Sequence, residues 1–252
     1  MKNKTRILVF DIETAPLLSY TWGLWEQNVI DISKQWYILS FSAKWLGEKK
    51  IISKGLPDYK TFTKDMENDK ELVADLWKLM DEADVVIAHN GNSFDVKKAN
   101  ARFIAHGMTP PSDYKKVDTK LVAKRYFKFD SNSLKDLAKY LKVEQKMETG
   151  GFQLWKDCMI GKKEAWKKML KYNKQDVVVL EQIYLKLRPW MDNHPNINIL
   201  DERIESCPIC GSNHLQSRGF SITRISKRRR FQCQECAGWS TGKPIRTEVE
   251  IR

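Results

Sequence analysis

The sequence predicts an α/β protein in which a sheet packs against helices, followed by a small metal-stabilised module. Strand patterns lie between the N-terminus and Ala88, whereas helical patterns dominate from Leu121 onward, as expected for a layered α/β domain. The chain has 252 residues and is 42% hydrophobic, which is enough for one sizeable core and a further small module. Four of the five cysteines form two Cys-X-X-Cys pairs near the C-terminus, the spacing of a metal site.

The strands are predicted from short apolar runs. Residues 6–13 contain the nearly continuous apolar run Ile7 to Phe10, which is typical of a central strand buried on both faces. Residues 36–45 and 50–54 flank a turn and predict a hairpin that pairs with the first strand. A further short apolar strand is expected over Asp84 to Ala88.

The helices are predicted from apolar residues at helical spacing. Leu72, Leu76 and Leu79 share one face and indicate a helix that packs on the sheet. Further helices are expected over Ser133 to Leu141 and over Glu164 to Leu187.

The domain boundary is expected in the segment 188–196, where two prolines close the last helical pattern and a polar linker begins. We therefore expect a first domain over residues 1–195 and a second module over residues 203–252. This second module carries a net +6, half of the total net charge of +12. Such a basic chain favours a polyanionic partner, of which nucleic acid is the commonest, although lysines that merely solvate helix faces are the alternative.

A cytoplasmic location is expected, in the host cytoplasm if the source is a virus. Asp11 and Glu13 interrupt the first apolar run too early for a signal peptide, and no apolar stretch is long enough to cross a membrane. The cysteine spacing suits a metal site rather than a disulfide framework and therefore a reducing compartment. Cys158 stands apart from these pairs and is interpreted as a structural thiol.

Carboxylates occur at three places that could converge on one pocket. Asp11 and Glu13 are two apart on a predicted strand, so their side chains project from the same face. Asp95 follows a strand and a glycine turn, in the first turn of a helix. Tyr172 and Asp176 are four apart on a helix and share one face. Each pattern alone has an ordinary explanation, namely a strand end, a helix cap or a half-exposed helix face, but their combination indicates a divalent-metal site.

These motifs resemble the signature of the DEDD 3′-to-5′ exonucleases. The matching segments are Asp-Ile-Glu-Thr at 11–14, His-Asn-Gly-Asn-Ser-Phe-Asp at 89–95 and Tyr-Asn-Lys-Gln-Asp-Val at 172–177, with further similarity at 117–119 and 133–137. The tyrosine four residues before the last aspartate is typical of the tyrosine subgroup, and the sequence is most similar to exonuclease domains of family B DNA polymerases. The resemblance implies an RNase H-like mixed sheet flanked by helices.

The resemblance also implies a mechanism and site residues. Asp11 would bridge two metal ions, Glu13 and Asp176 would complete the site on the nucleophile side, and Asp95 would serve the other ion. Tyr172 would orient the attacking water. Magnesium is expected because the ligands are hard oxygens and the substrate is a phosphate, with manganese as a substitute.

Other residues near these motifs have two interpretations each. His89 and Asn90 line a substrate groove or shape the turn before Asp95, the second being preferred. Asp118 is an auxiliary carboxylate or, by preference, caps the following helix. The tryptophans between residues 22 and 45 stack on bases or, by preference, pack in the hairpin and core.

The cysteine pairs predict a zinc ribbon. Cys207-Pro-Ile-Cys210 and Cys233-Gln-Glu-Cys236 are separated by 22 residues, and four thiolates would fill every position of one structural Zn²⁺. Between the pairs, residues 217–231 predict strands with a basic edge that could follow a phosphate backbone, unless the ribbon contacts protein or is merely solvated. The basic residues expected to contact nucleic acid there are Arg224, Lys227, Arg228, Arg229 and Arg230.

The function expected is hydrolysis of phosphodiester bonds at nucleic-acid 3′ ends, with DNA favoured over RNA and a pathway in repair, recombination or replication support. One alternative is an RNA exonuclease of the same mechanism. A second is a non-catalytic nucleic-acid adaptor, against which the presence of all four carboxylates and Tyr172 argues. A third is a DDE transposase or structure-specific endonuclease, which the Tyr-X-X-X-Asp motif fits poorly.

Overall fold

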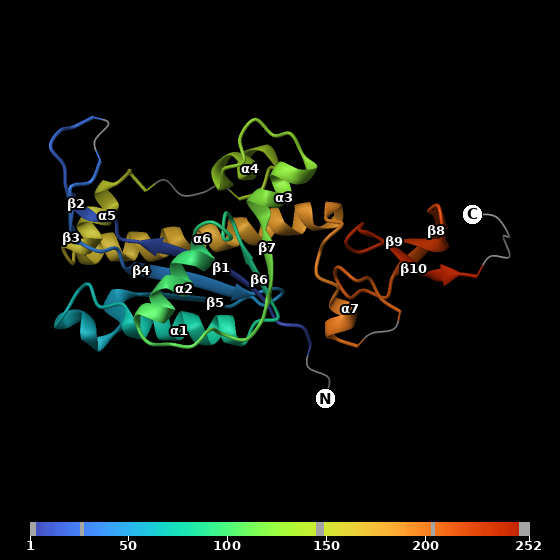
Figure 1. Ribbon diagram of the computed structural model, residues 1–252, viewed down its shortest axis with the longest axis horizontal. Helices are drawn as coiled ribbons and strands as arrows, with labels where there is room; N and C mark the ends of the chain where they lie inside the picture. The colour runs from blue at the N-terminus through green and yellow to red at the C-terminus, as the bar shows by residue number, and fades with distance from the viewer. Residues whose placement is uncertain (1–3, 26–27, 145–148, 203–204, 247–252) are drawn as a thin grey trace.

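The computed structural model describes residues 4–25, 28–144, 149–202 and 205–246. A larger body of sheet and helices lies at one end of an elongated molecule, and a small three-stranded sheet lies at the other (Figure 1). The two parts are joined by the segment that follows the longest helix. Over the described ranges, no helix is long and apolar enough to cross a membrane.

A mixed sheet of five described strands forms the centre of the larger body, in the order β5-β4-β1-β6-β7. β1 pairs in an antiparallel manner with β4 and in parallel with β6, so it is the central strand that the apolar run predicts. The hairpin expected on its flank is confirmed, because β4 and β5 pair in an antiparallel manner. The strands are β1 (Ile7–Thr14), β4 (Ile38–Trp45), β5 (Ile51–Gly55), β6 (Val85–Ala88) and β7 (Lys115–Asp118).

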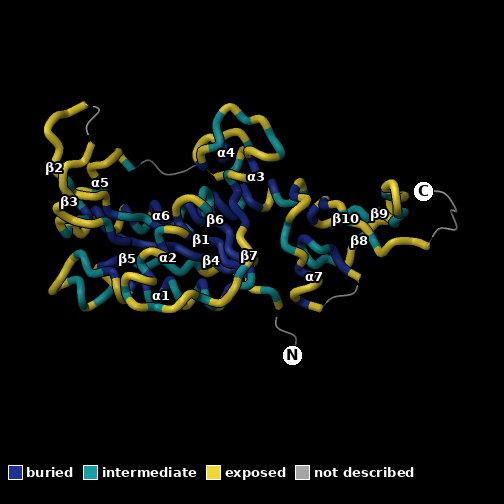
Figure 2. The backbone as a smooth tube through the Cα atoms, viewed as in Figure 1, coloured by how far each residue is buried: buried dark blue, intermediate teal, exposed yellow. Residues whose placement is uncertain are grey.

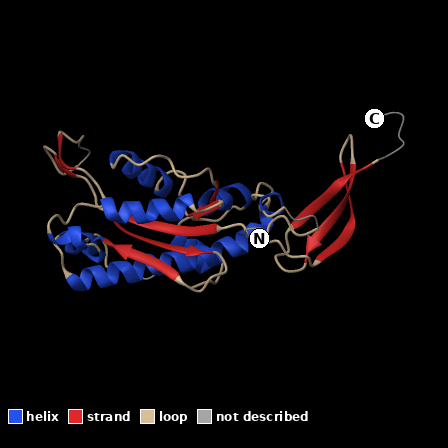
Figure 3. Ribbon diagram, turned by 90° about the horizontal axis from the view of Figure 1, so that it is seen from below, coloured by secondary structure: helices blue, strands red, loops and turns tan. Residues whose placement is uncertain are grey.

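Helices cover both faces of this sheet, as Figure 3 shows from below. The helices expected over residues 133–141 and 164–187 are confirmed as α4 and α6, and the Leu72 stripe lies on α1. Two short 3-10 helices, η1 (Leu56–Asp58) and η2 (Lys60–Thr63), precede α1. The α-helices are α1 (Lys70–Asp81), α2 (Asp95–Ala105), α3 (Thr119–Tyr126), α4 (Leu134–Tyr140), α5 (Gln153–Met159) and α6 (Lys163–Leu187).

The two faces of β1 contribute to separate apolar clusters because successive strand residues point in opposite directions. Leu8 and Phe10 belong to the cluster that includes α1 and α2. Val9 belongs to the cluster that includes Val177 and Leu180 of α6. Figure 2 shows this buried interior as dark blue along the sheet and α6. Asp11 and Glu13 follow Val9 in the same alternation and therefore face α6.

A buried carboxylate ties α1, α2 and β4 together. Asp69, fully buried before α1, accepts hydrogen bonds from Arg102 (2.8 and 2.5 Å) and from the Ile38 amide (2.8 Å). His106 Nε2 lies 2.7 Å from the same carboxylate. Because a buried charge is tolerated only when it is paired and hydrogen-bonded, this arrangement determines how the two helices sit on the sheet.

The tryptophans between residues 22 and 45 lie in different environments, and not all of them pack in the hairpin and core. β2 (Leu18–Tyr20) and β3 (Asp31–Lys34) form a separate two-stranded sheet, and Trp22 and Trp25 lie on the connection between them. These side chains are 88% and 82% exposed, so the expectation that they pack in a hairpin or core is wrong. The preference holds for Trp45, which is buried, and in part for Trp36, which packs at the edge of the core.

Cys158, interpreted as a structural thiol, is fully buried in α5. Burial raises the pKa of this thiol to about 12. It is therefore a packed apolar group, as expected.

The linker after α6 is ordered rather than extended. It contains a 3-10 helix, η3 (Arg188–Trp190), and α7 (Ile197–Leu200). The Ile197 amide donates to the carbonyl of Pro208 (2.9 Å), and the Thr5 amide donates to Asp201 (2.6 Å). These bonds connect the C-terminal part to the linker and the linker to the start of β1.

The C-terminal sheet has the described strands β8 (Leu215–Ile222), β9 (Lys227–Cys233) and β10 (Trp239–Ile245), in the order β10-β9-β8. The basic run Lys227 to Arg230 lies on the central strand β9. The expected basic edge is therefore wrong: because side chains alternate along a strand, the run presents positive charge on both faces of the ribbon. Local sequence predicts the strands but not their order, since two consecutive hairpins place β9 at the centre whereas a crossover connection would place β8 or β10 there.

Candidate active site and zinc site

Three carboxylates converge where β1 passes α6. Oxygens of Asp11, Glu13 and Asp176 lie within 4.8 Å of one another. Asp11 and Glu13 are half-buried on β1, and Asp176 is buried on α6. Hard carboxylate oxygens at this spacing are the donor set that Mg²⁺ or Mn²⁺ takes, and a cation would relieve the repulsion among three negative charges. The arrangement could therefore hold a divalent metal ion.

Asn173 is a further residue at this site, and sequence reasoning did not single it out. Its side chain is fully buried, and its Nδ2 donates to Asp11 Oδ2 at 2.6 Å. The hydroxyl of Ser40 on β4 donates to Asn173 Oδ1 at 3.4 Å, which orients the amide. Asn173 could have been found in the sequence from its position three residues before Asp176, because this spacing places both side chains on one helix face.

Tyr172 and Asp176 lie on the same face of α6, as their spacing predicts. Tyr172 is buried, and its ring meets Trp155 edge to face with centroids 6.1 Å apart. Burial raises the pKa of Tyr172 far above its ordinary value, and the carboxylates of Asp176, Glu13 and Asp11 act in the same direction. The side chain is consequently a neutral phenol that can donate a hydrogen bond beside the carboxylates.

Asp95 begins α2 and lies against β1, although it is not part of the three-carboxylate group just described. The amide of Ile12, between Asp11 and Glu13, donates to Asp95 Oδ1 at 3.2 Å. Burial raises the pKa of Asp95 to about 7, with a smaller contribution from the charge of Asp118. The fourth carboxylate of the sequence pattern is thus held beside the other three, on the neighbouring element.

His89 and Asn90 shape the turn before α2, the role that the sequence analysis prefers for them. Asn90 has a φ of 67°, and its carbonyl accepts from the amides of Ser93 and Phe94 (3.0 and 2.9 Å). At Gly91, any Cβ would lie 2.4 Å from the Cβ of Ala88, so only glycine fits. His89 Nδ1 lies 2.9 Å from the Thr119 hydroxyl.

Asp118 holds the same turn from the neighbouring strand. Its carboxylate accepts from the amides of Lys120 and Leu121 (3.0 and 3.2 Å), so it caps α3 as preferred. It also accepts from the amides of Asn90 and Asn92 (3.0 and 3.1 Å). Asp118 therefore positions the turn that carries Asp95.

A groove of about 630 Å³ begins at Thr14, the residue that follows Glu13. Its walls include the aromatic rings of Trp36, Phe152 and Trp155. Lys98 Nζ lies 3.6 Å above the Trp36 ring, and burial lowers the pKa of this amine. An aromatic groove with one cation beside a carboxylate cluster can accommodate a flat base and a phosphate.

Comparison with known protein families agrees with this geometry. The model of the RNase H superfamily matches residues 8–188, which include the sheet and all four carboxylates. The chain belongs to the RNase H superfamily. A search among curated proteins finds no match.

Solved structures similar to this RNase H superfamily chain include the family B DNA polymerase from the hyperthermophilic archaeon Pyrobaculum calidifontis, with a TM-score of 0.57 and 14% sequence identity. The match covers 90% of this chain and 32% of the polymerase, so the chain spans about a third of that protein. At this identity the similarity concerns the fold.

Downstream of the RNase H domain, the four predicted cysteines meet in one cluster. The sulfurs of Cys207, Cys210, Cys233 and Cys236 all lie within 4.8 Å of one another, which could bind zinc. Both knuckles are tight turns: the amide of Gly211 donates to the carbonyl of Cys207 (2.8 Å), and that of Ala237 to the carbonyl of Cys233 (3.0 Å). Apart from the cysteines, this small core includes Ile209 and Leu215, so a metal ion would supply most of its cross-linking.

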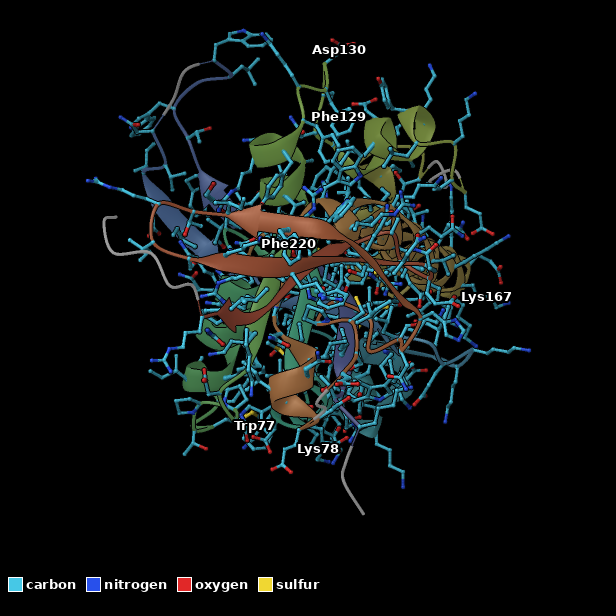
Figure 4. The ribbon with its side chains drawn as sticks, turned by 90° about the vertical axis from the view of Figure 1, so that its right-hand side faces the viewer. Trp77, Lys78, Phe129, Asp130, Lys167 and Phe220 are labelled. Atoms are coloured by element: carbon cyan, nitrogen blue, oxygen red, sulfur yellow. The ribbon has the colours of Figure 1, made fainter. Side chains whose placement is uncertain are left out.

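The basic side chains of the ribbon lie against aromatic rings on both faces of β9. Lys227 Nζ lies 4.3 Å from the centre of the Phe220 ring, and the Arg230 guanidinium lies 4.9 Å from that of Trp239. Arg228 donates to the carbonyl of Gly242 (3.4 Å). Arg224 and Arg229 are exposed. Figure 4 looks onto this end of the molecule, with Phe220 on the strand surface.

Proposed function

We propose that this chain is a two-metal-dependent 3′-to-5′ exonuclease of the tyrosine DEDD subgroup that acts on nucleic-acid 3′ ends, with DNA favoured over RNA. The observation that carries the proposal is the convergence of Asp11, Glu13 and Asp176 from a strand and a helix within 4.8 Å. Asp95 and Tyr172 beside them complete the residue set of that subgroup. The RNase H fold supports a nucleic-acid substrate.

The proposed metal ligands are Asp11, Glu13 and Asp176, with Asp95 serving a second ion. Their donor atoms are all hard oxygens, which suits Mg²⁺ or Mn²⁺. When bound, two such ions would activate a water molecule and stabilise the negative charge that develops on the phosphate. Asn173 positions Asp11 through its hydrogen bond, and Ile12 positions Asp95 through its amide.

Tyr172 orients the attacking water in this proposal. Because its phenol is held neutral, it can donate to the water or to a phosphate oxygen, and the adjacent Trp155 ring limits its movement. The groove that begins at Thr14 receives the 3′-terminal nucleotide. Its base would contact Trp36 or Phe152, and Lys98 would approach the phosphate.

The second module, residues 203–252, supports the nuclease domain, residues 1–195, by holding the substrate. One structural Zn²⁺ at the four cysteines would stabilise its fold. The proposed phosphate contacts are Arg224 and the run Lys227 to Arg230 on β9. Asn90 is a proposed nucleic-acid contact at the active site. Affinity from such contacts decreases as salt increases.

The proposal is tested with single strands of DNA and RNA, labelled at either the 5′ or the 3′ end, incubated with magnesium, with and without a chelator. Wild type is compared with Asp11→Asn and with Glu164→Gln, which removes an exposed carboxylate at the far end of α6. We expect a magnesium-dependent ladder that shortens from the 3′ end, lost in Asp11→Asn and retained in Glu164→Gln.

The other outcomes separate the alternatives. Degradation of RNA alone would replace the DNA preference with an RNA exonuclease of the same mechanism. Cleavage of a circular single strand, included as a further substrate, would indicate an endonuclease. Tight binding without cleavage under every metal condition would contradict the exonuclease proposal and favour a nucleic-acid adaptor.

A further inference from the structure

A row of four aromatic rings lies on α4, the loop before it and η3. In Figure 1, α3, α4 and the end of α6 lie between the middle of α6 and the C-terminal sheet. Phe127 and Phe129 stack with centroids 5.1 Å apart and an interplanar angle of 22°. Trp190 meets Phe127 edge-on at 5.3 Å, and Tyr140 meets Phe129 edge-on at 4.9 Å. We call Tyr140, Phe129, Phe127 and Trp190 the aromatic row. It joins three segments of the chain: α4, the loop before it, and the turn after α6.

The outer rings of the aromatic row face solvent. Trp190 is 60% exposed and Tyr140 is 66% exposed, whereas Phe127 and Phe129 are half-buried against the apolar cluster of α3, α4 and α6. The inner rings therefore anchor a surface on which the outer rings remain available. Leaving two large aromatic side chains in water forgoes the stabilisation that their burial would provide, which favours a binding role.

Positive charge surrounds the aromatic row. Residues 124–142 contain six Lys or Arg and two Asp or Glu, a net +4. Lys124, Lys128, Lys139 and Lys142 among them are exposed. Aromatic rings interleaved with exposed cations match single-stranded nucleic acid, whose bases stack on rings while its phosphates meet the cations. An acidic protein could match the positive charge, but a single strand offers both regularly spaced phosphates for the cations and flat bases for the rings.

The aromatic row is also tied to the candidate active site. His89, in the turn before Asp95, contacts the carbonyl of Asn132 at 3.0 Å through Nε2, in the loop that carries Phe129. Asp118 contacts that same turn and caps α3, and Phe127 directly follows α3. The eight residues of α3 span about 12 Å, the length of roughly three to four stacked nucleotides. Figure 4 shows Phe129 at the outer edge of the molecule, with Phe220 of the ribbon in the same view.

We infer that the aromatic row binds the unpaired strand a few nucleotides upstream of the 3′ end, between the catalytic pocket and the ribbon. This inference rests on the proposed function for its direction along the strand. It adds that the substrate is single-stranded where it crosses α3 and α4, because the bases of a duplex are stacked on each other and cannot stack on Tyr140 or Trp190. Trp190 and Tyr140 are strand-binding residues that take no part in the chemical step.

Binding is measured by fluorescence anisotropy with single strands of about 16 nucleotides, without magnesium and without chelator, so that neither cleavage nor zinc loss interferes. We expect Trp190→Ala and Tyr140→Ala each to weaken binding roughly fivefold or more, since base stacking of this kind is substantial. Trp190→Phe and Tyr140→Phe keep a ring and should retain most of the affinity. Ile104→Ala, at a position 77% exposed on α2, is the matched control for loss of an exposed apolar side chain.

Substrate length and strandedness separate this inference from the proposed function. On long strands, Trp190→Ala should raise KM and leave kcat unchanged, whereas on a dinucleotide it should change neither. Equal binding by Trp190→Ala, Tyr140→Ala and wild type would overturn the inference, as would an equal loss of affinity for blunt duplex. If wild type cleaves nothing, the exonuclease proposal fails, and the anisotropy measurements still decide whether the aromatic row binds single strands.

Discussion

The side-chain amide of Asn173 donates to the carboxylate of Asp11, with Nδ2 2.6 Å from Oδ2 although the residues are 162 positions apart. The bond joins α6 to the centre of β1 and fixes one orientation of Asp11. Since Ser40 holds the other end of the amide, the contact extends from α6 across β1 to β4. Such outer contacts to candidate metal ligands commonly affect both metal affinity and rate.

Asn173→Ala is expected to lower the exonuclease rate about 10- to 100-fold and to raise the magnesium concentration needed for half-maximal activity, because Asp11 loses its fixed orientation. A magnesium titration of the cleavage rate measures both effects. Gln175→Ala, on the same helix but bonded to Glu144, is the control. An unchanged magnesium midpoint in a folded Asn173→Ala protein would show that this amide serves packing alone.

Tyr172→Phe should reduce kcat by roughly 100-fold, with little change in KM, because it keeps the ring and removes the hydrogen-bond donor that the proposed function assigns to the attacking water. The contact with Trp155 involves the ring, so the thermal stability should stay close to that of wild type. Single-turnover cleavage separates the chemical step from binding. A wild-type rate in Tyr172→Phe would remove the phenol from the mechanism.

Cys233→Ser is expected to abolish zinc binding and unfold the ribbon, while the RNase H domain stays folded around its own core. Zinc content by mass spectrometry should fall from one ion per chain to none. Cleavage of a dinucleotide should persist, but affinity for long strands should fall. Cys158→Ala is the control, since Cys158 lies in the core far from the ribbon cysteines in the fold, and it should retain zinc. Full zinc content in Cys233→Ser would contradict the assigned ligand set.

Asp69→Ala should destabilise the RNase H domain by about 3–5 kcal/mol, because it leaves the Arg102 charge without its carboxylate in a largely buried place. Urea unfolding followed by circular dichroism measures this change. Glu67→Gln breaks the exposed pair with Lys34 and should cost less than about 1 kcal/mol. Similar losses in both variants would mean that the Asp69 cluster does not hold α1 and α2 on the sheet.

Trp22→Ala should change the free energy of unfolding by less than about 0.5 kcal/mol, since the side chain is 88% exposed. Trp45→Ala, at a buried position of β4, should cost about 3–5 kcal/mol through the cavity it leaves. The same unfolding experiment compares the two. A large loss in Trp22→Ala would restore the packing role that the sequence interpretation preferred.

Much of the candidate site was predictable because its geometry is local. The shared strand face of Asp11 and Glu13 follows from the two-residue alternation of side chains along a strand. The shared helix face of Tyr172 and Asp176 follows from their spacing of four residues. Each Cys-X-X-Cys pair is brought together by a tight turn within four residues. The strands and helices follow from apolar periodicity.

The α/β class, the main elements, the two carboxylate-bearing faces and the four-cysteine cluster were all predictable from local patterns in the sequence. Three features became visible only in the folded chain: Asn173 contacts Asp11, Lys98 lies over Trp36, and Trp22 and Trp25 are exposed. The tertiary structure also placed the basic strand β9 at the centre of the ribbon. The difference is one of range. Periodicity indicates which side of its own helix or strand a residue occupies, whereas strand order and packing across the sheet determine which distant residue it contacts.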